Sequence, residues 1–216
     1  MKNRLRSPKS RKLSSNRWLY RHINDPFVRK ARSDNYRSRA SYKLLEINEK
    51  FTVIQKGSSV LELGSAPGGW TQVISQILDG TGRIVAADLT EMDPISGVEF
   101  LKLDIEAQAS VLDEYLNSSK FDLVLSDLAP NASGSSATDS IASIRLSRVV
   151  LDYARKYLKG DGSVVMKILK GSEDEYELIR LLKKKFKKVE YFKPNSSRKA
   201  SREIYLVMRG RVDQGK

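Results

Sequence analysis

The chain has 216 residues, 40% of them hydrophobic, which is enough for one α/β domain with a full core and short for two. It contains no cysteine and a single histidine, so disulfides and cysteine-ligated metal centres are excluded, and histidine-based metal sites and Ser-His-Asp catalysis are disfavoured. The longest apolar runs are far below the ~18 residues of a membrane span, so no membrane association is expected.

The net charge of +13 is concentrated at the two ends of the chain. Residues 1–43 carry 14 Lys and Arg against 2 acids, residues 183–216 carry 12 against 3, and the middle carries 13 against 21. Aromatic residues lie among the basic ones: Trp18, Tyr20, Tyr36, Tyr42, Tyr191 and Phe192. This combination suits a phosphate backbone and exposed bases, so we expect a nucleic-acid partner and an exposed or RNA-facing His22. The alternatives are a solvated charged surface and an organelle transit peptide over residues 1–24.

Hydrophobic periodicity after the basic arm predicts an alternation of helices and strands. The first predicted helix runs from Arg39 to Phe51 and carries Lys43 in its first turn or so. The remaining predicted helices cover 69–78, 107–117, 140–158 and 173–185, and the predicted strands cover 60–63, 83–88, 98–103, 121–126, 163–167, 189–193 and 203–208. The order indicates an α/β fold with a mostly parallel, doubly wound sheet and helices on both faces.

Side chains suited to ligand binding follow several of these strands. Asp127 follows the apolar run 121–125 and leads into a Pro-containing turn, and the Gly-rich turn Gly64–Trp70 ends the first strand in the same way. Asp88 and Asp104 end or follow the next two strands. Because ligands of such sheets bind at the carboxyl ends of the strands, these groups should meet in one crevice. Asp127 is the predicted centre of an active site.

The Gly-rich turn fits an adenosine-containing cofactor better than a triphosphate. It is not Gly-x-Gly-x-x-Gly, and it lacks the lysine and Ser/Thr of a P-loop. Gly64 and Gly68 permit close backbone approach, Asp88 is placed to accept hydrogen bonds from ribose hydroxyls, and Asp104 from an adenine amino group or ribose. S-adenosylmethionine, whose sulfonium and amino groups are cationic, suits this acidic crevice better than NAD. The alternatives are tight helix packing at Gly68 and a strand-end cap at Asp104.

Seven segments spread along the chain carry motifs that occur together in one enzyme family. They are Ser15–Leu19, Arg37–Leu44, Leu63–Trp70, Met92–Ile95, Ser126–Gly134, Val165–Lys167 and Lys193–Tyr205. Together they resemble the FtsJ family of ribosomal RNA 2'-O-methyltransferases over nearly the whole chain. The resemblance implies a Rossmann-like methyltransferase fold with an antiparallel closing strand and S-adenosylmethionine as methyl donor.

The resemblance also implies a Lys-Asp-Lys-Glu catalytic tetrad. Carried over by motif, its members are Lys43, Asp127, Lys167 and Glu203. The implied cofactor contacts are Gly64, Gly68, Trp70, Asp88, Asp104 and Asp127. The implied substrate is the 2'-hydroxyl of a uridine in the A-loop of 23S ribosomal RNA, met within the large ribosomal subunit.

Three regions are expected: a basic, partly mobile RNA-binding arm over residues 1–36, a single methyltransferase domain over 37–210 and a tail over 211–216. We expect a monomer without a metal, acting in the cytoplasm, with a mitochondrial location as the alternative. A transfer-RNA, cap or haemolysin-like 2'-O-methyltransferase, a catalytically idle RNA-binding or ribosome-assembly protein and a nicotinamide oxidoreductase are the rival functions.

The tetrad suggests a division of labour in methyl transfer. Lys167 is the predicted general base, because burial and a second nearby cation, Lys43, favour the neutral form of a lysine. Asp127 opposes this effect, so we expect it to orient Lys167 and to anchor the methionine part of the cofactor. Glu203 would orient one of the lysines. The alternatives are a solvated Lys43 and a Glu203 that only forms a surface salt bridge.

Overall fold

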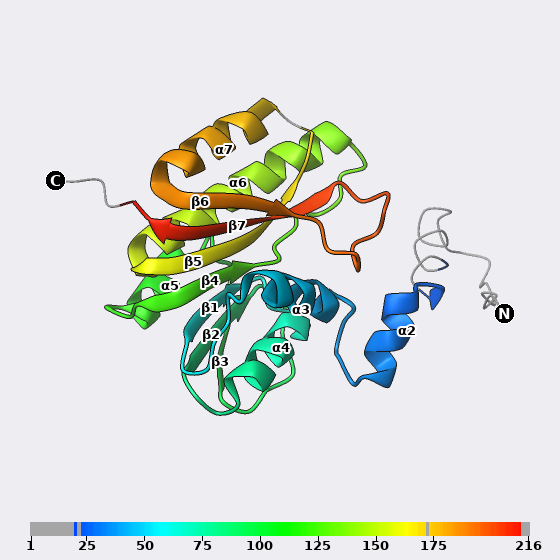
Figure 1. Ribbon diagram of the computed structural model, residues 1–216, viewed down its shortest axis with the longest axis horizontal. Coiled ribbons are helices and arrows are strands. Elements are labelled where there is room, and N and C mark those ends of the chain that lie inside the picture. The colour runs from blue at the N-terminus through cyan, green and yellow to red at the C-terminus, as the bar shows by residue number, and fades with distance from the viewer. Residues whose placement is uncertain (1–19, 21–22, 172, 213–216) are drawn as a thin grey trace.

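The computed structural model describes residues 20, 23–171 and 173–212, so the predictions for His22 and for most of the basic arm lie outside it. Its centre is a seven-stranded sheet in the order β3-β2-β1-β4-β5-β7-β6 (Figure 1). The strands are β1 Ser59–Leu63, β2 Arg83–Asp88, β3 Val98–Lys102, β4 Phe121–Ser126, β5 Leu158–Leu169, β6 Phe186–Phe192 and β7 Glu203–Arg211. Only the two pairings made by β7 are antiparallel, which confirms the predicted sheet.

Helices cover both faces of this sheet (Figure 1). The helices are α2 Pro26–Ser33, α3 Ala40–Phe51, α4 Gly69–Leu78, α5 Ala109–Leu116, α6 Ser136–Tyr157 and α7 Glu173–Lys185. One buried apolar cluster joins α3 and α4 to the sheet, and a second joins α5, α6 and α7 to its other face. Strands buried on both faces explain the Val, Ile and Leu runs that made them recognisable in the sequence. Among the described residues, no helix is long and apolar enough to cross a membrane.

The register of the strands aligns their carboxyl ends. Leu63 at the end of β1 pairs with Ala87 of β2 and with Ser126 of β4. Ser126 in turn pairs with Met166 of β5. The residues that follow these positions, the Gly-rich turn among them, therefore lie side by side at one edge of the sheet.

Two predicted boundaries were wrong where a helix runs directly into a strand. α6 ends at Tyr157 and β5 begins at Leu158, five residues before the predicted start at residue 163. The pairing of β4 with β5 shifts register between Phe121 and Leu123, and Gly160 and Gly162 lie in the irregular part of β5 opposite this shift. In the same way α7 ends at Lys185 and β6 begins at Phe186, three residues before the predicted start at residue 189, so the predicted loop between them is part of the strand.

Helix α2 lies inside the segment expected to be only a basic arm. Asp25 caps it by accepting a hydrogen bond from the backbone N–H of Phe27 at 3.0 Å, and Pro26 occupies the first helical turn. An Asp-Pro pair before a short amphipathic stretch is a helix start signal, so the sequence carried this information. The helix lies next to α3, and Phe27 packs against Tyr42 of that helix.

Candidate active site

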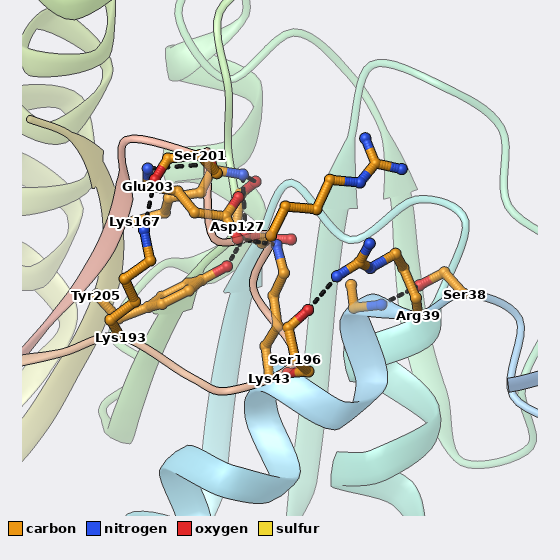
Figure 2. Close-up of polar contacts among 12 residues, drawn as sticks. Ser38, Arg39, Lys43, Asp127, Lys167, Lys193, Ser196, Ser201, Glu203 and Tyr205 are labelled. Carbon is orange, nitrogen blue, oxygen red and sulfur yellow. Dashed lines mark hydrogen bonds and ion pairs between the residues drawn. The ribbon is translucent and has the colours of Figure 1, made fainter. Parts of the chain in front are cut away.

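Asp127 accepts two hydrogen bonds at the carboxyl end of β4. Lys167 Nζ lies 2.8 Å from Asp127 Oδ1, and the Tyr205 hydroxyl donates to the same oxygen at 2.6 Å (Figure 2). Lys167 also donates to the backbone carbonyl of Asp127. The sheet dictates this meeting, because Asp127 follows the Ser126 and Met166 pair, and Lys167 pairs with Tyr205 across β5 and β7.

Lys43 reaches the same place from helix α3. Its Nζ lies 2.8 Å from Glu203 Oε1, at the start of β7 (Figure 2). The close packing of α3 on α4 holds it there: the Ser41 hydroxyl donates to the Gly69 carbonyl at 2.9 Å. A Cβ at Gly69 would lie 2.2 Å from the Ser38 hydroxyl oxygen, so this approach requires glycine.

The structure thus brings the four predicted tetrad residues together as two ion pairs. The side chains are 11% exposed at Lys43, 15% at Glu203, 8% at Lys167 and 18% at Asp127. Charges this deeply buried are tolerated only when each is paired and hydrogen-bonded. Within the cluster, each lysine has one carboxylate partner.

Both carboxyl groups of the cluster are ionised at neutral pH. Burial raises the pKa of Asp127, but the charges of Lys167 and Lys43 outweigh it and the pKa lies below its ordinary value. Burial likewise raises the pKa of Glu203, and the adjacent Lys43 turns the balance to a lowered pKa. A carboxylate with a lowered pKa is a weak base, so both groups are better suited to holding cations than to taking a proton.

Tyr205 is a member of this cluster that the sequence analysis did not single out. Burial raises the pKa of its hydroxyl well above the ordinary value, and the charges of Asp127 and Glu203 raise it further. The hydroxyl therefore stays protonated and acts as a donor to Asp127. The alternation of side chains along a strand could have identified Tyr205 from the sequence. Tyr205 lies two residues after Glu203 and therefore faces the same side of the sheet.

The Gly-rich turn forms a cradle beside this cluster. Gly64 adopts a φ of +84°, and a Cβ there would lie 3.2 Å from the backbone nitrogen of Leu128, the residue after Asp127. Gly68 adopts a φ of +99°, and a Cβ there would lie 2.8 Å from the sulfur of Met92. Within the described chain, the buried Ser65 hydroxyl has no hydrogen-bond partner. Both glycines are therefore required by the packing of the protein's own groups, and the unused Ser65 hydroxyl is the polar atom that the turn leaves for a ligand such as an adenosine-type methyl donor.

The acids of the neighbouring strands already bind backbone but keep acceptor capacity. Asp88 accepts from the N–H of Ala66 at 2.9 Å and of Thr90 at 2.7 Å, which ties β2 to the Gly-rich turn. Asp104 Oδ1 accepts from the N–H groups of Ala107 and Glu106, and these bonds lower its pKa. A carboxylate offers about four lone-pair sites, so both acids can also accept from a ribose or an adenine.

Trp70, a predicted cofactor contact, lies in the core of the protein. Its side chain is buried in the core, its indole N–H donates to the Ala40 carbonyl at 2.8 Å, and its ring packs against Tyr205 with 5.6 Å between centroids. In this position Trp70 supports α3 and Tyr205 from behind. Direct contact between Trp70 and a cofactor stays a prediction.

A basic hollow opens beside Lys43 and Glu203. It encloses about 330 Å³ and is also lined by Arg39 and Arg198. Both arginines bind the carboxylate of Asp25, Arg198 at 3.2 Å, so the start of α2, helix α3 and the loop before β7 are joined at one point. The hollow reaches the Lys43–Glu203 ion pair.

Comparison with known proteins identifies the family. The FtsJ-like methyltransferase family model matches residues 36–211. The chain belongs to this family. Among relatives of the family, the "Ribosomal RNA large subunit methyltransferase E" of Neorickettsia sennetsu is 63% identical over 98% of this chain and 100% of its own length. The protein of the same name from Marinobacter nauticus is 49% identical over 93% and 98%.

Two solved structures have a fold similar to that of this chain. A ribosomal RNA methyltransferase from Plasmodium falciparum superposes with a TM-score of 0.71 at 32% identity, covering 82% of this chain and 98% of that one. The fibrillarin/Nop5p complex matches with a TM-score of 0.56 at 19% identity over 79% and 82%, a likeness of fold alone. The predicted family resemblance and the Rossmann-like methyltransferase fold are confirmed. Membership also implies a methyl donor of the S-adenosylmethionine type.

Proposed function

We propose that this chain transfers a methyl group from S-adenosylmethionine to the ribose 2'-hydroxyl of a uridine in the A-loop of 23S ribosomal RNA. The observation that carries the proposal is the buried Lys-Asp-Lys-Tyr-Glu cluster beside the Gly-rich cradle. The names of the bacterial relatives support the RNA substrate and the large subunit. They also favour action in the cytoplasm over a mitochondrion, and a monomeric state stays a prediction.

The cradle residues would hold the donor, whose sulfonium supplies an electrophilic methyl group. The backbone at Gly64 and Gly68 would border it, and Asp88 and Asp104 would accept from its ribose and adenine. Asp127 would lie between donor and acceptor, since it follows β4 next to the cradle and binds Lys167. An ionised Asp127 also attracts the cationic methionine part.

The remaining requirement is to place the 2'-hydroxyl and remove its proton. In-line placement contributes up to about 7–11 kcal/mol and a general base typically about 10²- to 10⁴-fold, so positioning dominates. Asp127 and Glu203 are poor bases because their pKa values are lowered. Lys167, held by Asp127, is therefore the proposed proton acceptor, and it would take the proton as a neutral amine, after its own ammonium proton has passed to solvent. Lys43 would steer the hydroxyl oxygen and stabilise the negative charge that develops on it.

The substrate would enter through the hollow lined by Arg39, Arg198 and Glu203. Its cations suit the phosphates that flank the target nucleotide. The loop of residues 193–202 forms one wall, and Lys193 donates to the Ser201 carbonyl within it. Because Arg39 and Arg198 share Asp25, a phosphate in the hollow would meet two arginines whose positions are already fixed.

The decisive test replaces Lys167. Lys167→Ala should lower the single-turnover rate of methylation of undermethylated large subunits by at least about 100-fold while cofactor affinity stays within a few-fold. Lys159→Ala is the matched control, since Lys159 lies in the same strand but pairs with Asp122 at its far end. Near-normal single-turnover methylation by Lys167→Ala would remove Lys167 from the base role.

Two further measurements address the substrate and the rival functions. Mapping 2'-O-methyl groups in ribosomal RNA from a strain that lacks the protein should show one loss, in the A-loop. Loss at any other nucleotide overturns the substrate assignment. Tritium transfer from labelled cofactor to large subunits separates the enzyme from a catalytically idle assembly protein, which would bind the subunits without labelling them.

A further inference from the structure

A second hollow lies at the opposite edge of the sheet from the ion-pair cluster. It encloses about 480 Å³ between α6, α7 and the end of β7. Its apolar lining includes Leu151, Leu181 and Phe186. Leu181 is 41% exposed. The volume falls within the range of about 300–1,000 Å³ that small-molecule and nucleotide sites occupy.

Cations surround this apolar surface. Arg148, Arg155, Lys185 and Arg211 line the hollow, and Asp152 is the one acid among its described lining residues. Asp152 lies 3.8 Å from Arg155, and both side chains are mostly exposed, so this pair neutralises little of the charge.

A smaller hollow continues the first along α7. It encloses about 270 Å³, shares Arg148 and Leu181 with its neighbour, and adds Arg180, Lys184 and Glu177. The two adjoining hollows are here together called the α6–α7 groove. Among the residues that the structure describes, six cations and two acids line the groove.

The α6–α7 groove is separate from the catalytic cluster. Phe186 pairs with Arg211 at the far end of β6 and β7, whereas Tyr205 lies six residues earlier in β7. Six residues of strand span roughly 20 Å, so a nucleotide bound at Asp127 does not reach the groove.

The groove also accounts for part of the basic segment 183–216. Some of its cations line the catalytic hollow, and others line the groove.

We propose that the α6–α7 groove binds a single-stranded segment of the same ribosomal RNA, as a second contact remote from the target nucleotide. This inference rests on the proposed function. Charge complementarity selects a polyanion, and the apolar lining selects unstacked nucleotides over a duplex, whose bases are covered. A base or ribose lies on Leu151 and Leu181, and its flanking phosphates meet Arg148 and Lys185.

Two separated contacts explain how a small enzyme selects one nucleotide of a large particle. Binding at the groove raises the effective concentration of the catalytic hollow near its target, provided the RNA spans both sites. The groove therefore acts on substrate capture and leaves the chemical step alone. Its loss should appear in KM and in the salt dependence of binding.

The test reverses two groove charges, Arg148→Glu with Lys185→Glu. The matched control is Lys183→Glu with Lys187→Glu, which makes the same change in net charge at exposed positions of α7 and β6 that do not line the groove. For undermethylated large subunits, the groove variant should show a KM raised on the order of tenfold and a salt slope reduced by about two, with kcat and cofactor affinity within twofold. The control should stay within twofold of wild type throughout.

The outcomes separate this proposal from the function on which it rests. Failure of the wild-type protein to methylate ribosomal RNA removes the proposed function. Normal wild-type activity together with an unchanged KM and salt slope in the groove variant overturns the groove proposal alone. A groove variant that binds protein-free 23S RNA like wild type but assembled subunits weakly also overturns it, because a ribosomal protein is then the occupant.

Discussion

Glu62 should make the stability of this protein fall as the pH rises. It lies in β1 beneath the Gly-rich turn, 1% exposed, with the Thr71 hydroxyl 2.7 Å from its carboxyl oxygen. Burial raises the pKa of Glu62 to about 8, the Thr71 hydroxyl opposes the shift, and the charges of Asp127 and Asp88 reinforce it. Among the described residues, no lysine or arginine is a main cause of this shift. Glu62 is therefore protonated in the folded protein at pH 7.

The sign follows from proton linkage. Between its ordinary pKa of 4.5 and about 8, Glu62 holds a proton in the folded state and has lost it in the unfolded state. The free energy of unfolding then falls by about 1.4 kcal/mol for each unit of rising pH. The contribution is fully present below pH 4.5 and is lost once the pH passes about 8. Over three units this reaches about 4 kcal/mol, a large part of the ~5–15 kcal/mol that holds a domain together.

Urea unfolding of wild type and Glu62→Gln from pH 5.5 to 8.5 measures this directly. The amide keeps the size and the contact with Thr71 but cannot ionise, so the stability advantage of Glu62→Gln over wild type should grow with pH. Exposed Glu49 provides the control, since Glu49→Gln should leave the wild-type pH dependence unchanged. Parallel curves for wild type and Glu62→Gln would refute the reasoning, because the carboxyl would then be ionised in the folded protein.

Two other substitutions probe the catalytic cluster and the hollow beside it. Tyr205→Phe removes a hydrogen-bond donor from the buried carboxylate of Asp127. It should lower the free energy of unfolding, measured in urea, by about 1.5–3 kcal/mol and slow methyl transfer. If both quantities stay unchanged, Asp127 needs no second donor. Asp25→Asn keeps the helix cap but removes the charge between Arg39 and Arg198, so it should cost about 1–3 kcal/mol and raise the KM for RNA. A wild-type KM and stability would contradict a positioning role for Asp25.

The sequence contained most of the fold because its signals were local. Buried parallel strands appear as runs of Val, Ile and Leu, and the Gly-rich turn after Leu63 marks where the first one ends. The errors lie where a helix and a strand share a boundary without a turn, at Tyr157 and Lys185. There the partner strand decides the assignment, and the pairing of Leu158 with Phe121 has no local signal.

The sequence predicted which charged residues form the active site, but not which lysine binds which carboxylate. Motifs identified the four charged residues of the tetrad, yet which lysine binds which carboxylate depends on strand register and on the reach of α3. Lys167 binds Asp127 because β4 and β5 are neighbours, and Lys43 binds Glu203 because α3 packs over the start of β7. Tyr205 was missed because a tyrosine in an apolar strand looks like core.

The pairing changes how substitutions in this cluster should be interpreted. Removing Lys43 leaves Glu203 as a buried charge without its partner, and removing Lys167 does the same to Asp127, so a single substitution combines a lost function with an uncompensated charge. Replacing both members of one pair removes that charge and isolates the functional loss. If Lys43 steers the hydroxyl itself, Lys43→Met with Glu203→Gln should restore stability relative to Lys43→Met and leave methylation slow. If Lys43 serves only to neutralise Glu203, the double variant should recover activity as well.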